Sequence, residues 1–129
     1  MIEYLSVAQV LELHRAQLRL FGGAAGLRDR GALEAAVARP ASTFDGEDLY
    51  ADLAAKAAAM MHSLVQSHPF VDGNKRVAAA AAELLIVLNG GVLAASDAEL
   101  EAVTMAVARG EMGCEVLTVW LRQRLVPAP

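Results

Sequence analysis

The chain has 129 residues, a length that suits one domain with its own hydrophobic core, and we expect a single domain over residues 1–129. Its residues are 56% hydrophobic but only 5% aromatic, a composition that favours closely packed helices over a sheet rich in β-branched side chains. Lysine and arginine total 11 against 15 acidic residues, and the net charge of −4 provides no general attraction to nucleic acid or to anionic membranes, so we expect neither as a direct partner.

The cysteine content and the N-terminus both bear on the compartment. Cys114 is the one cysteine, which excludes an internal disulfide and fits a reducing environment. The first ten residues carry one glutamate, Glu3, and no basic segment before an apolar run, so they do not resemble a secretory signal. The longest apolar run, Val77 to Leu88, contains Glu83 and is shorter than the roughly 20 residues that cross a bilayer. We therefore expect a cytoplasmic protein.

Capping residues and apolar periodicity predict an all-α fold of about six helices. Capping boxes are expected at Ser6 with Gln9 and at Ser96 with Glu99, and Asp29 is placed to cap a short helix. In chain order, the expected helices cover residues 7–20, 31–37, 49–66, 74–88, 97–109 and 114–125.

The segments between these helices place one loop at the centre of the fold. Pro69 lacks an amide hydrogen and disfavours helix in the residue before it, so the third helix should end by about Ser67. The fourth helix is apolar on nearly every face, as expected of a central helix. The segment 40–46 is typical of a turn, and the end 127–129 is expected to fray. A short loop after Ser67 then joins the two innermost helices.

That loop and the helix start after it, residues 68–76, concentrate a possible base, a carboxylate, two cations and a glycine. Taken singly, each residue also fits a structural role as a cap, a turn residue or a solvated cation. A structural turn needs one cap and one glycine, however, and cations at a helix N-terminus oppose the helix dipole. The combination therefore indicates a functional site.

The chemistry of the loop points to a phosphate-bearing ligand. The helix start exposes unpaired N–H groups, Gly73 lets a ligand approach the backbone, and Lys75 and Arg76 add positive charge at the same end. Asp72 is a hard oxygen ligand of the kind that Mg²⁺ shares with substrate phosphates. His68, with an unperturbed pKa of about 6.5, is suited to accept a proton from a hydroxyl nucleophile. Together these residues predict phosphoryl-type transfer.

The two other histidines are expected to be structural. His14 lies among leucines on the first helix, and we expect a packed, hydrogen-bonded residue there and not a metal ligand. His62 is six residues before His68, a poor spacing for two ligands on one helix face, so it should lie in the core or at its boundary.

The string His68-Pro69-Phe70-Val71-Asp72-Gly73-Asn74-Lys75-Arg76 resembles the H-P-F-x-D-G-N-K-R signature of the Fic/Doc family, in its Doc (death-on-curing) toxin branch. The resemblance extends over essentially the whole chain, through Phe21-Gly22-Gly23, Gly26-Leu27-Arg28-Asp29, Leu33 to Pro40 and Asn89-Gly90. It implies an all-helical domain with the motif loop between the two central helices. It also implies modification of a protein hydroxyl with ATP as the substrate and Mg²⁺ as the metal.

The resemblance also implies a role for each motif residue. The histidine matching His68 activates the target hydroxyl, and the acid matching Asp72 holds the metal. The residues matching Asn74, Lys75 and Arg76 hold phosphates, and Gly73 is added to these expected phosphate-binding residues on the geometric grounds above. Phe70 would be the buried anchor of the loop, a role that its hydrophobicity alone supports.

Two positions distinguish this chain from the adenylylating members of the family. Those members resemble H-P-F-x-D-G-N-G-R-x-x-R, with glycine where Lys75 stands and arginine where Ala79 stands. A lysine fills space against the helix N-terminus and adds a charge, so the nucleotide should lie in a different pose.

In the Doc branch, that pose implies a kinase. The resemblance thus implies a toxin of a type II toxin–antitoxin module that transfers the γ-phosphate of ATP to a threonine or serine hydroxyl of a translation factor, with elongation factor Tu the implied target, and so arrests translation. An adenylyltransferase and a catalytically silent antitoxin-binding module remain as alternatives.

Control of the activity is expected to come from a second chain. A self-inhibitory S/T-x-x-x-E-G/N motif is not evident, since the segment Thr43 to Glu47 is followed by Asp48. The resemblance implies a small antitoxin of the prevent-host-death type, whose disordered tail folds into a groove on the toxin.

Overall fold

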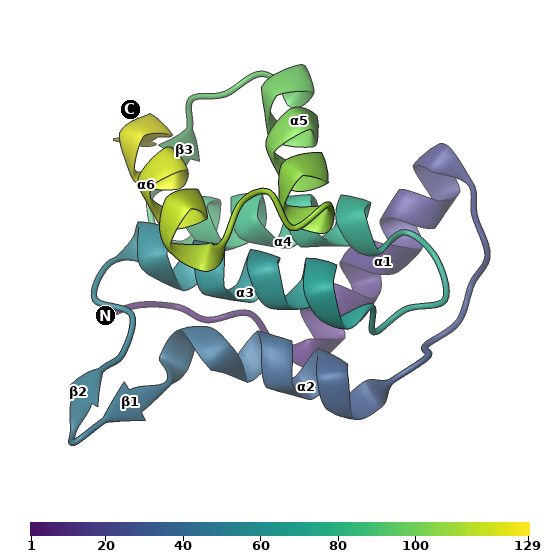
Figure 1. The fold of residues 1–129 in the computed structure, drawn as a ribbon, viewed down its shortest axis with the longest axis horizontal. Coiled ribbons are helices and arrows are strands. Elements are labelled where there is room, and N and C mark those ends of the chain that lie inside the picture. The colour runs from purple at the N-terminus through teal and green to yellow at the C-terminus, as the bar shows by residue number, and fades with distance from the viewer.

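The computed structural model describes all of residues 1–129 and contains six α-helices and two short antiparallel strand pairs (Figure 1). The helices are α1 (Val7–Phe21), α2 (Arg30–Ala38), α3 (Leu53–Ser67), α4 (Asn74–Leu88), α5 (Asp97–Ala108) and α6 (Cys114–Arg124). One turn of 3-10 helix, η1 (Arg39–Ala41), follows α2. The strands are β1 (Thr43–Phe44), β2 (Glu47–Asp48), β3 (Gly91–Leu93) and β4 (Leu125–Pro127). The predicted all-α fold of about six helices is confirmed.

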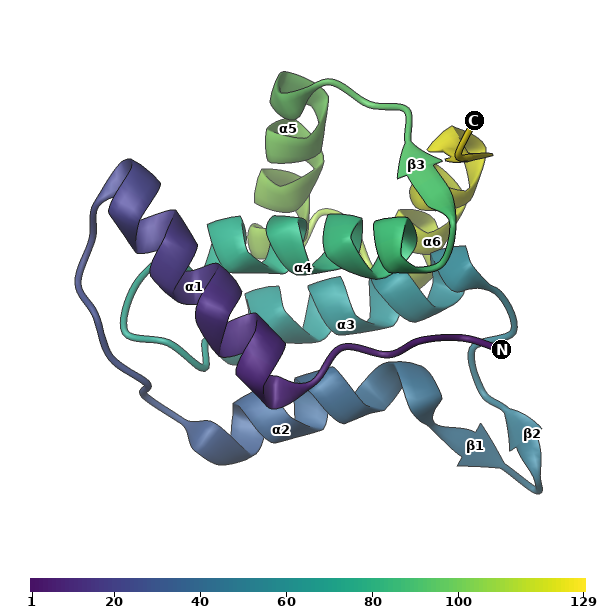
Figure 2. The same cartoon turned by 180° about the vertical axis from the view of Figure 1, so that it is seen from behind.

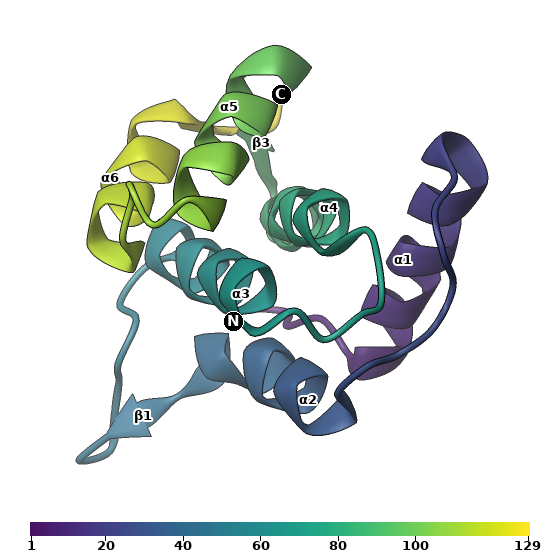
Figure 3. The same ribbon diagram turned by 45° about the vertical axis from the view of Figure 1, so that its right-hand side comes forward.

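Helices α3 and α4 form the centre of the molecule. Figure 3 looks nearly along these two helices and shows them between α1 on one side and α5 with α6 on the other. Seen from behind, α1 crosses α4 and reaches α2, which covers the remaining side of α3 (Figure 2). The motif loop therefore starts and ends on the two helices that have the most neighbours to hold them.

None of the helices has the length and apolarity that crossing a membrane would require.

Small side chains allow the two central helices to pack closely. Their fully buried alanines are Ala57, Ala58, Ala59, Ala78, Ala81 and Ala82. Met60, Met61 and Leu64 of α3 and Leu85 and Ile86 of α4 fill the remaining volume and are at most 1% exposed. The prediction that α4 is a central helix is confirmed, although its last residues reach the surface.

The predicted helix caps are present. The Ser6 hydroxyl accepts a hydrogen bond from the Gln9 N–H, and the Gln9 side chain accepts one from the Ser6 N–H. Ser96 and Glu99 form the same reciprocal pair at the start of α5. The Asp29 carboxylate accepts a hydrogen bond from an N–H in the first turn of α2. Helices α1 and α5 begin at the predicted residue and α2 begins one residue earlier than predicted, because each cap lies within three residues of its partner.

The predicted start of α3 at residue 49 is wrong, since the helix begins at Leu53. The Asp52 carboxylate caps the helix by accepting a hydrogen bond from the Ala55 N–H at 2.9 Å. It also forms an ion pair with Arg122 of α6, with 2.7 Å between the nearest nitrogen and oxygen. A side chain that caps a helix sits in extended backbone outside it, so Asp52 ends the preceding segment.

The turn predicted at 40–46 and the frayed tail predicted at 127–129 also need correction. Residues 39–41 form η1, and β1 and β2 form a hairpin whose turn residues Asp45 and Gly46 both have positive φ, as a type I′ turn requires. At the other end of the chain, β4 pairs with β3 and brings Pro127 opposite Gly91.

A buried lysine connects the hairpin to the core. The side chain of Lys56 on α3 is 2% exposed, and its ammonium group donates to the Asp48 carboxylate at 3.1 Å and to the Pro40 carbonyl at 3.4 Å. The ring of Tyr4 lies 5.6 Å from the same nitrogen, measured to the ring centre. Lys56 thus holds the hairpin, η1 and the N-terminal segment together.

Replacing Lys56 by methionine should detach the hairpin with little effect on the fold. Methionine fills much of the same volume, and Asp48 is 54% exposed, so its carboxylate stays hydrated when the ammonium group is lost. We expect a change of about 1 kcal/mol or less in the free energy of unfolding and faster hydrogen exchange at the Leu49 N–H, which bonds to the Ser42 carbonyl. Urea unfolding and hydrogen exchange measure the two effects.

The matched variant Lys56→Ala should behave differently. It leaves a cavity beside α3 and should lower the free energy of unfolding by about 2–5 kcal/mol. Equal stability losses in the two variants would show that the ammonium group, and not the packed side chain, holds this region together.

Candidate functional site

The motif occupies a tight loop, residues 68–73, followed by the first turn of α4. His68 is the C-cap residue of α3 and has left-handed backbone angles, with φ 48° and ψ 60°. Gly73 precedes α4 with φ 78° and ψ 17°, also left-handed. A non-glycine residue in this region is uncommon and costs conformational energy, so neighbouring contacts must hold His68 in place.

The connection between α1 and α2 provides those contacts. Arg28 donates from its guanidinium to the carbonyl of His68 and to the carbonyl of Ser67, each at 2.6 Å. The N–H groups of Arg28 and Asp29 both bond to the Pro69 carbonyl, at 2.8 and 2.9 Å. In Figure 3 the α1–α2 connection runs alongside the motif loop. Arg28 therefore satisfies the open carbonyls at the end of α3 and fixes the backbone of His68.

Phe70 and Asn74 hold the middle of the loop. The Phe70 side chain is 1% exposed and belongs to the main hydrophobic core. The Asn74 side chain accepts from the Phe70 N–H and donates to the Phe70 carbonyl, both at 2.9 Å. Because the Asn74 amide is occupied in this way, a contact of Asn74 with phosphate would come from its main-chain N–H.

The Asp72 carboxylate is exposed at the surface of the loop. One oxygen accepts from the Ala24 N–H at 3.1 Å and the other from the Gly73 N–H at 2.8 Å. The hydrogen bond from Ala24, followed by that from Gly73, lowers the pKa of Asp72 below its usual value, and the positive charge of Arg76 acts in the same direction. Asp72 is thus a carboxylate at neutral pH, and each oxygen retains a lone pair for a metal ion.

Close packing explains one glycine of the α1–α2 connection. A Cβ atom at Gly23, where φ is 118°, would lie 2.7 Å from an Asp72 carboxylate oxygen. Any other residue there would displace the carboxylate or the connection.

The start of α4 carries uncompensated positive charge. Lys75 and Arg76 are exposed, and neither takes part in an ion pair. The Arg76 guanidinium lies over the ring of Phe21 at 5.0 Å, and no side chain caps the helix. The helix dipole, the first-turn N–H groups and two cations therefore act together on the solvent beside Asp72, which favours an anionic ligand.

The three histidines occupy different environments. His68 is exposed, and its imidazole makes no hydrogen bond within the protein. His14 is 4% exposed, stacks on Phe70 with 3.8 Å between ring centres, and lies 2.7 Å through Nε2 from the Asp72 carbonyl oxygen. His62 is partly buried, and burial followed by the charge of Arg39 lowers its pKa. The packed, hydrogen-bonded role predicted for His14 and the boundary position predicted for His62 are both confirmed.

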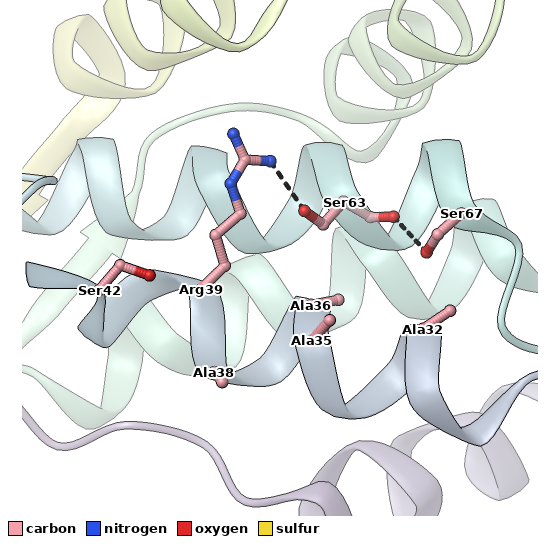
Figure 4. Close-up of a pocket in the computed structure, with 8 residues that line it drawn as sticks. All are labelled: Ala32, Ala35, Ala36, Ala38, Arg39, Ser42, Ser63 and Ser67. Carbon is pink, nitrogen blue, oxygen red and sulfur yellow. Dashed lines mark hydrogen bonds between the residues drawn. The ribbon is translucent and has the colours of Figure 1, made fainter.

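Two of the surface hollows are lined by residues outside the motif. One of about 380 Å³ lies between α2 and α3, and Figure 4 shows it lined by alanines of α2 and by Arg39, Ser63 and Ser67. Its Ser67 end adjoins His68. The other, of about 490 Å³, lies along α1 and reaches Leu84 of α4.

The β1–β2 hairpin lies at the end of α3 opposite the motif loop (Figure 1).

The structure thus brings the predicted residues together, whereas their chemical roles stay predictions. His68, Asp72, Gly73, Lys75 and Arg76 lie on one exposed loop and helix start. Two residues were not connected with the motif from the sequence, namely Arg28, which holds the backbone of His68, and His14, which holds that of Asp72. The sequence placed Arg28 in a stretch that resembles the family and predicted a hydrogen bond for His14, but it indicated the partner of neither residue.

Comparisons with known proteins agree with the motif. The family model described as Fic/DOC family matches residues 4–86. The chain is 50% identical over 95 residues to "Toxin Doc" of Mycolicibacterium smegmatis, which covers 74% of this chain and 71% of that protein. It is 30% identical over 122 residues to "Protein kinase doc" of Escherichia phage P1, which covers 95% of each chain.

Proposed function

Because this chain belongs to the Fic/DOC family, we propose that it is the toxin of a type II toxin–antitoxin module and acts as a protein kinase. Its reaction is transfer of the γ-phosphate of ATP to a threonine or serine hydroxyl of a translation factor, with elongation factor Tu the first target to test. The product would block translation and arrest growth. A small antitoxin of the prevent-host-death type would be the partner that restrains it.

One observation carries most of this proposal. An exposed imidazole and an exposed carboxylate flank a helix N-terminus with two unpaired cations. Such an arrangement suits a nucleotide triphosphate, since the phosphates meet the N–H groups and positive charge while the imidazole stays open to a second reactant. The relative named as a protein kinase, similar over 95% of both chains, supports the same class of reaction.

The proposed step assigns one task to each side chain. His68 accepts the proton of the target hydroxyl as its oxygen attacks the γ-phosphorus. The bond from that phosphorus to the β–γ bridging oxygen breaks, and ADP leaves. Lys75, Arg76 and the N–H groups at the start of α4 hold the phosphates. Asp72 would hold Mg²⁺, which when bound neutralises phosphate charge, and the remaining ligands would be phosphate and water oxygens.

Lys75 is the reason for preferring the γ-phosphate. Its side chain stands at the second residue of α4, where the adenylylating signature has glycine, and Ala79 replaces the second arginine of that signature. The added bulk and charge oppose the adenylylating pose of the nucleotide.

Labelled nucleotide distinguishes the two reactions. The protein is incubated with elongation factor Tu, Mg²⁺ and ATP that carries radioactive phosphorus at either the α or the γ position. We expect the target to acquire label from γ-labelled ATP and none from α-labelled ATP, since only the terminal phosphoryl group is transferred. A reaction containing a metal chelator serves as the blank.

Two other outcomes would contradict the proposed kinase activity. Label arriving from the α position would identify an adenylyltransferase and contradict the kinase. Absence of label together with absence of nucleotide binding by calorimetry would identify a catalytically silent binding module.

A further inference from the structure

His14 is a buried residue outside the motif whose side chain hydrogen-bonds to the backbone of Asp72. It belongs to α1, 58 residues away in the sequence, and its Nε2 lies 2.7 Å from the Asp72 carbonyl oxygen. A carbonyl oxygen can only accept a hydrogen bond, so Nε2 must carry the hydrogen. The imidazole ring is at the same time stacked on Phe70, with an angle of 11° between the planes.

This hydrogen bond fixes the peptide between Asp72 and Gly73. In a trans peptide the C=O and the N–H point in opposite directions. With the carbonyl turned inward to His14, the Gly73 N–H points outward, where it donates to the Asp72 carboxylate at 2.8 Å. The other oxygen of that carboxylate accepts from the Ala24 N–H. The orientation of the carboxylate therefore depends on a peptide whose other side is held by His14.

We propose that His14 is a positioning residue that sets the direction of the Asp72 carboxylate and of the Gly73 N–H, and so the affinity of the site for a magnesium–nucleotide complex. The inference rests on the proposed function for the identity of the ligand. Partners that orient metal ligands without touching the metal typically change metal affinity by 10- to 100-fold when they are removed. His14 stands in that relation to Asp72 through the main chain.

Three substitutions separate the hydrogen bond from the packing. In His14→Gln, the side-chain amide nitrogen is the same number of bonds from Cβ as Nε2, so the donor is kept and the ring is lost. In His14→Phe, the stacked ring is kept and the donor is lost. In His14→Asn, a donor is present but one bond too short to reach the Asp72 carbonyl, which provides a polar variant without the hydrogen bond.

The first measurement uses the protein without ligand. Solvent exchange of the Gly73 and Ala24 N–H groups, followed by NMR, reports on the two hydrogen bonds of the Asp72 carboxylate. We expect exchange roughly three- to tenfold faster in His14→Phe and His14→Asn and close to the original rate in His14→Gln. The Ala32 N–H, which bonds to Asp29 at 3.0 Å, is the internal control and should not change.

The second measurement is calorimetric titration with Mg²⁺ and the β,γ-imido analogue of ATP. Affinity should fall roughly 10-fold or more in His14→Phe and His14→Asn and stay within roughly threefold of the original in His14→Gln, because that variant keeps the donor. Urea unfolding of each variant accompanies the titration, since a purely structural role would follow stability and not the presence of a donor.

The inference fails if His14→Phe keeps both the exchange rates and the affinity, or if His14→Gln is impaired as strongly as the variants without a donor. If the original protein does not bind the nucleotide analogue, the proposed function fails, and the exchange rates of Gly73 and Ala24 still decide the role of His14.

Discussion

Replacing His68 by asparagine will lower the rate of phosphoryl transfer to the target by roughly 10² to 10⁴ and leave the fold intact. His68 is exposed and makes no side-chain hydrogen bond within the protein, so its removal deprives the core of no contact. Asparagine cannot serve as a general base at neutral pH, yet it tolerates left-handed backbone angles better than most residues. Single-turnover kinetics with γ-labelled ATP measure the rate.

The choice of substitution matters because of the backbone at position 68. Alanine would remove the imidazole and would also adopt φ 48° less readily than histidine or asparagine, which are enriched at such angles, so a loss of activity in His68→Ala mixes two causes. Asparagine and alanine should therefore share the loss of rate and differ in stability. Nucleotide affinity should remain within roughly threefold in both, since the base acts on the target hydroxyl. An asparagine variant with full activity would remove His68 from the mechanism.

Replacing Phe70 by alanine will produce the largest loss of stability expected from any residue of the motif. The side chain is 1% exposed, stacks on His14 and fills the core beneath the loop. Phe→Ala substitutions at such positions lower the free energy of unfolding by about 3–5 kcal/mol through lost transfer energy and the cavity left behind. Small domains are stable by only about 5–15 kcal/mol, so this substitution should remove a large fraction of the total stability. Urea unfolding monitored by circular dichroism measures the loss.

The conservative variant Phe70→Leu is the matched control. It keeps most of the apolar volume but not the ring stacking, and should lose on the order of 1 kcal/mol. A loss below about 1 kcal/mol in Phe70→Ala would show that the Asn74 hydrogen bonds, and not the buried ring, hold the loop.

Sequence reasoning located the site because its residues are contiguous. The left-handed turn, the exposed carboxylate and the cations all lie between His68 and Arg76, so no long-range contact is needed to bring them together. The same holds for the helix starts after Ser6, Asp29 and Ser96, where each cap bonds to an N–H three residues away.

What the sequence did not reveal depends on contacts between distant segments. Arg28 reaches the His68 carbonyl across 40 residues, and nothing in the spacing of the two residues indicates that contact. Strand β4 forms only because β3 provides a partner, so the sequence placed Leu125 in the last helix and Pro127 in a fraying tail. Asp45 and Gly46 were different, since an Asp-Gly pair is a recognised hairpin signal and was read only as a turn.

At position 68, the residue proposed for catalysis has a left-handed backbone conformation that lowers the stability of the fold. Glycine adopts such angles without steric cost, so His68→Gly would relieve the conformation while removing the imidazole. On the proposed mechanism, screening variants of this protein for heat resistance alone would enrich glycine at position 68 and yield molecules without the general base. Thermostable versions intended for assays must be selected with a catalytic readout, or with this position held constant.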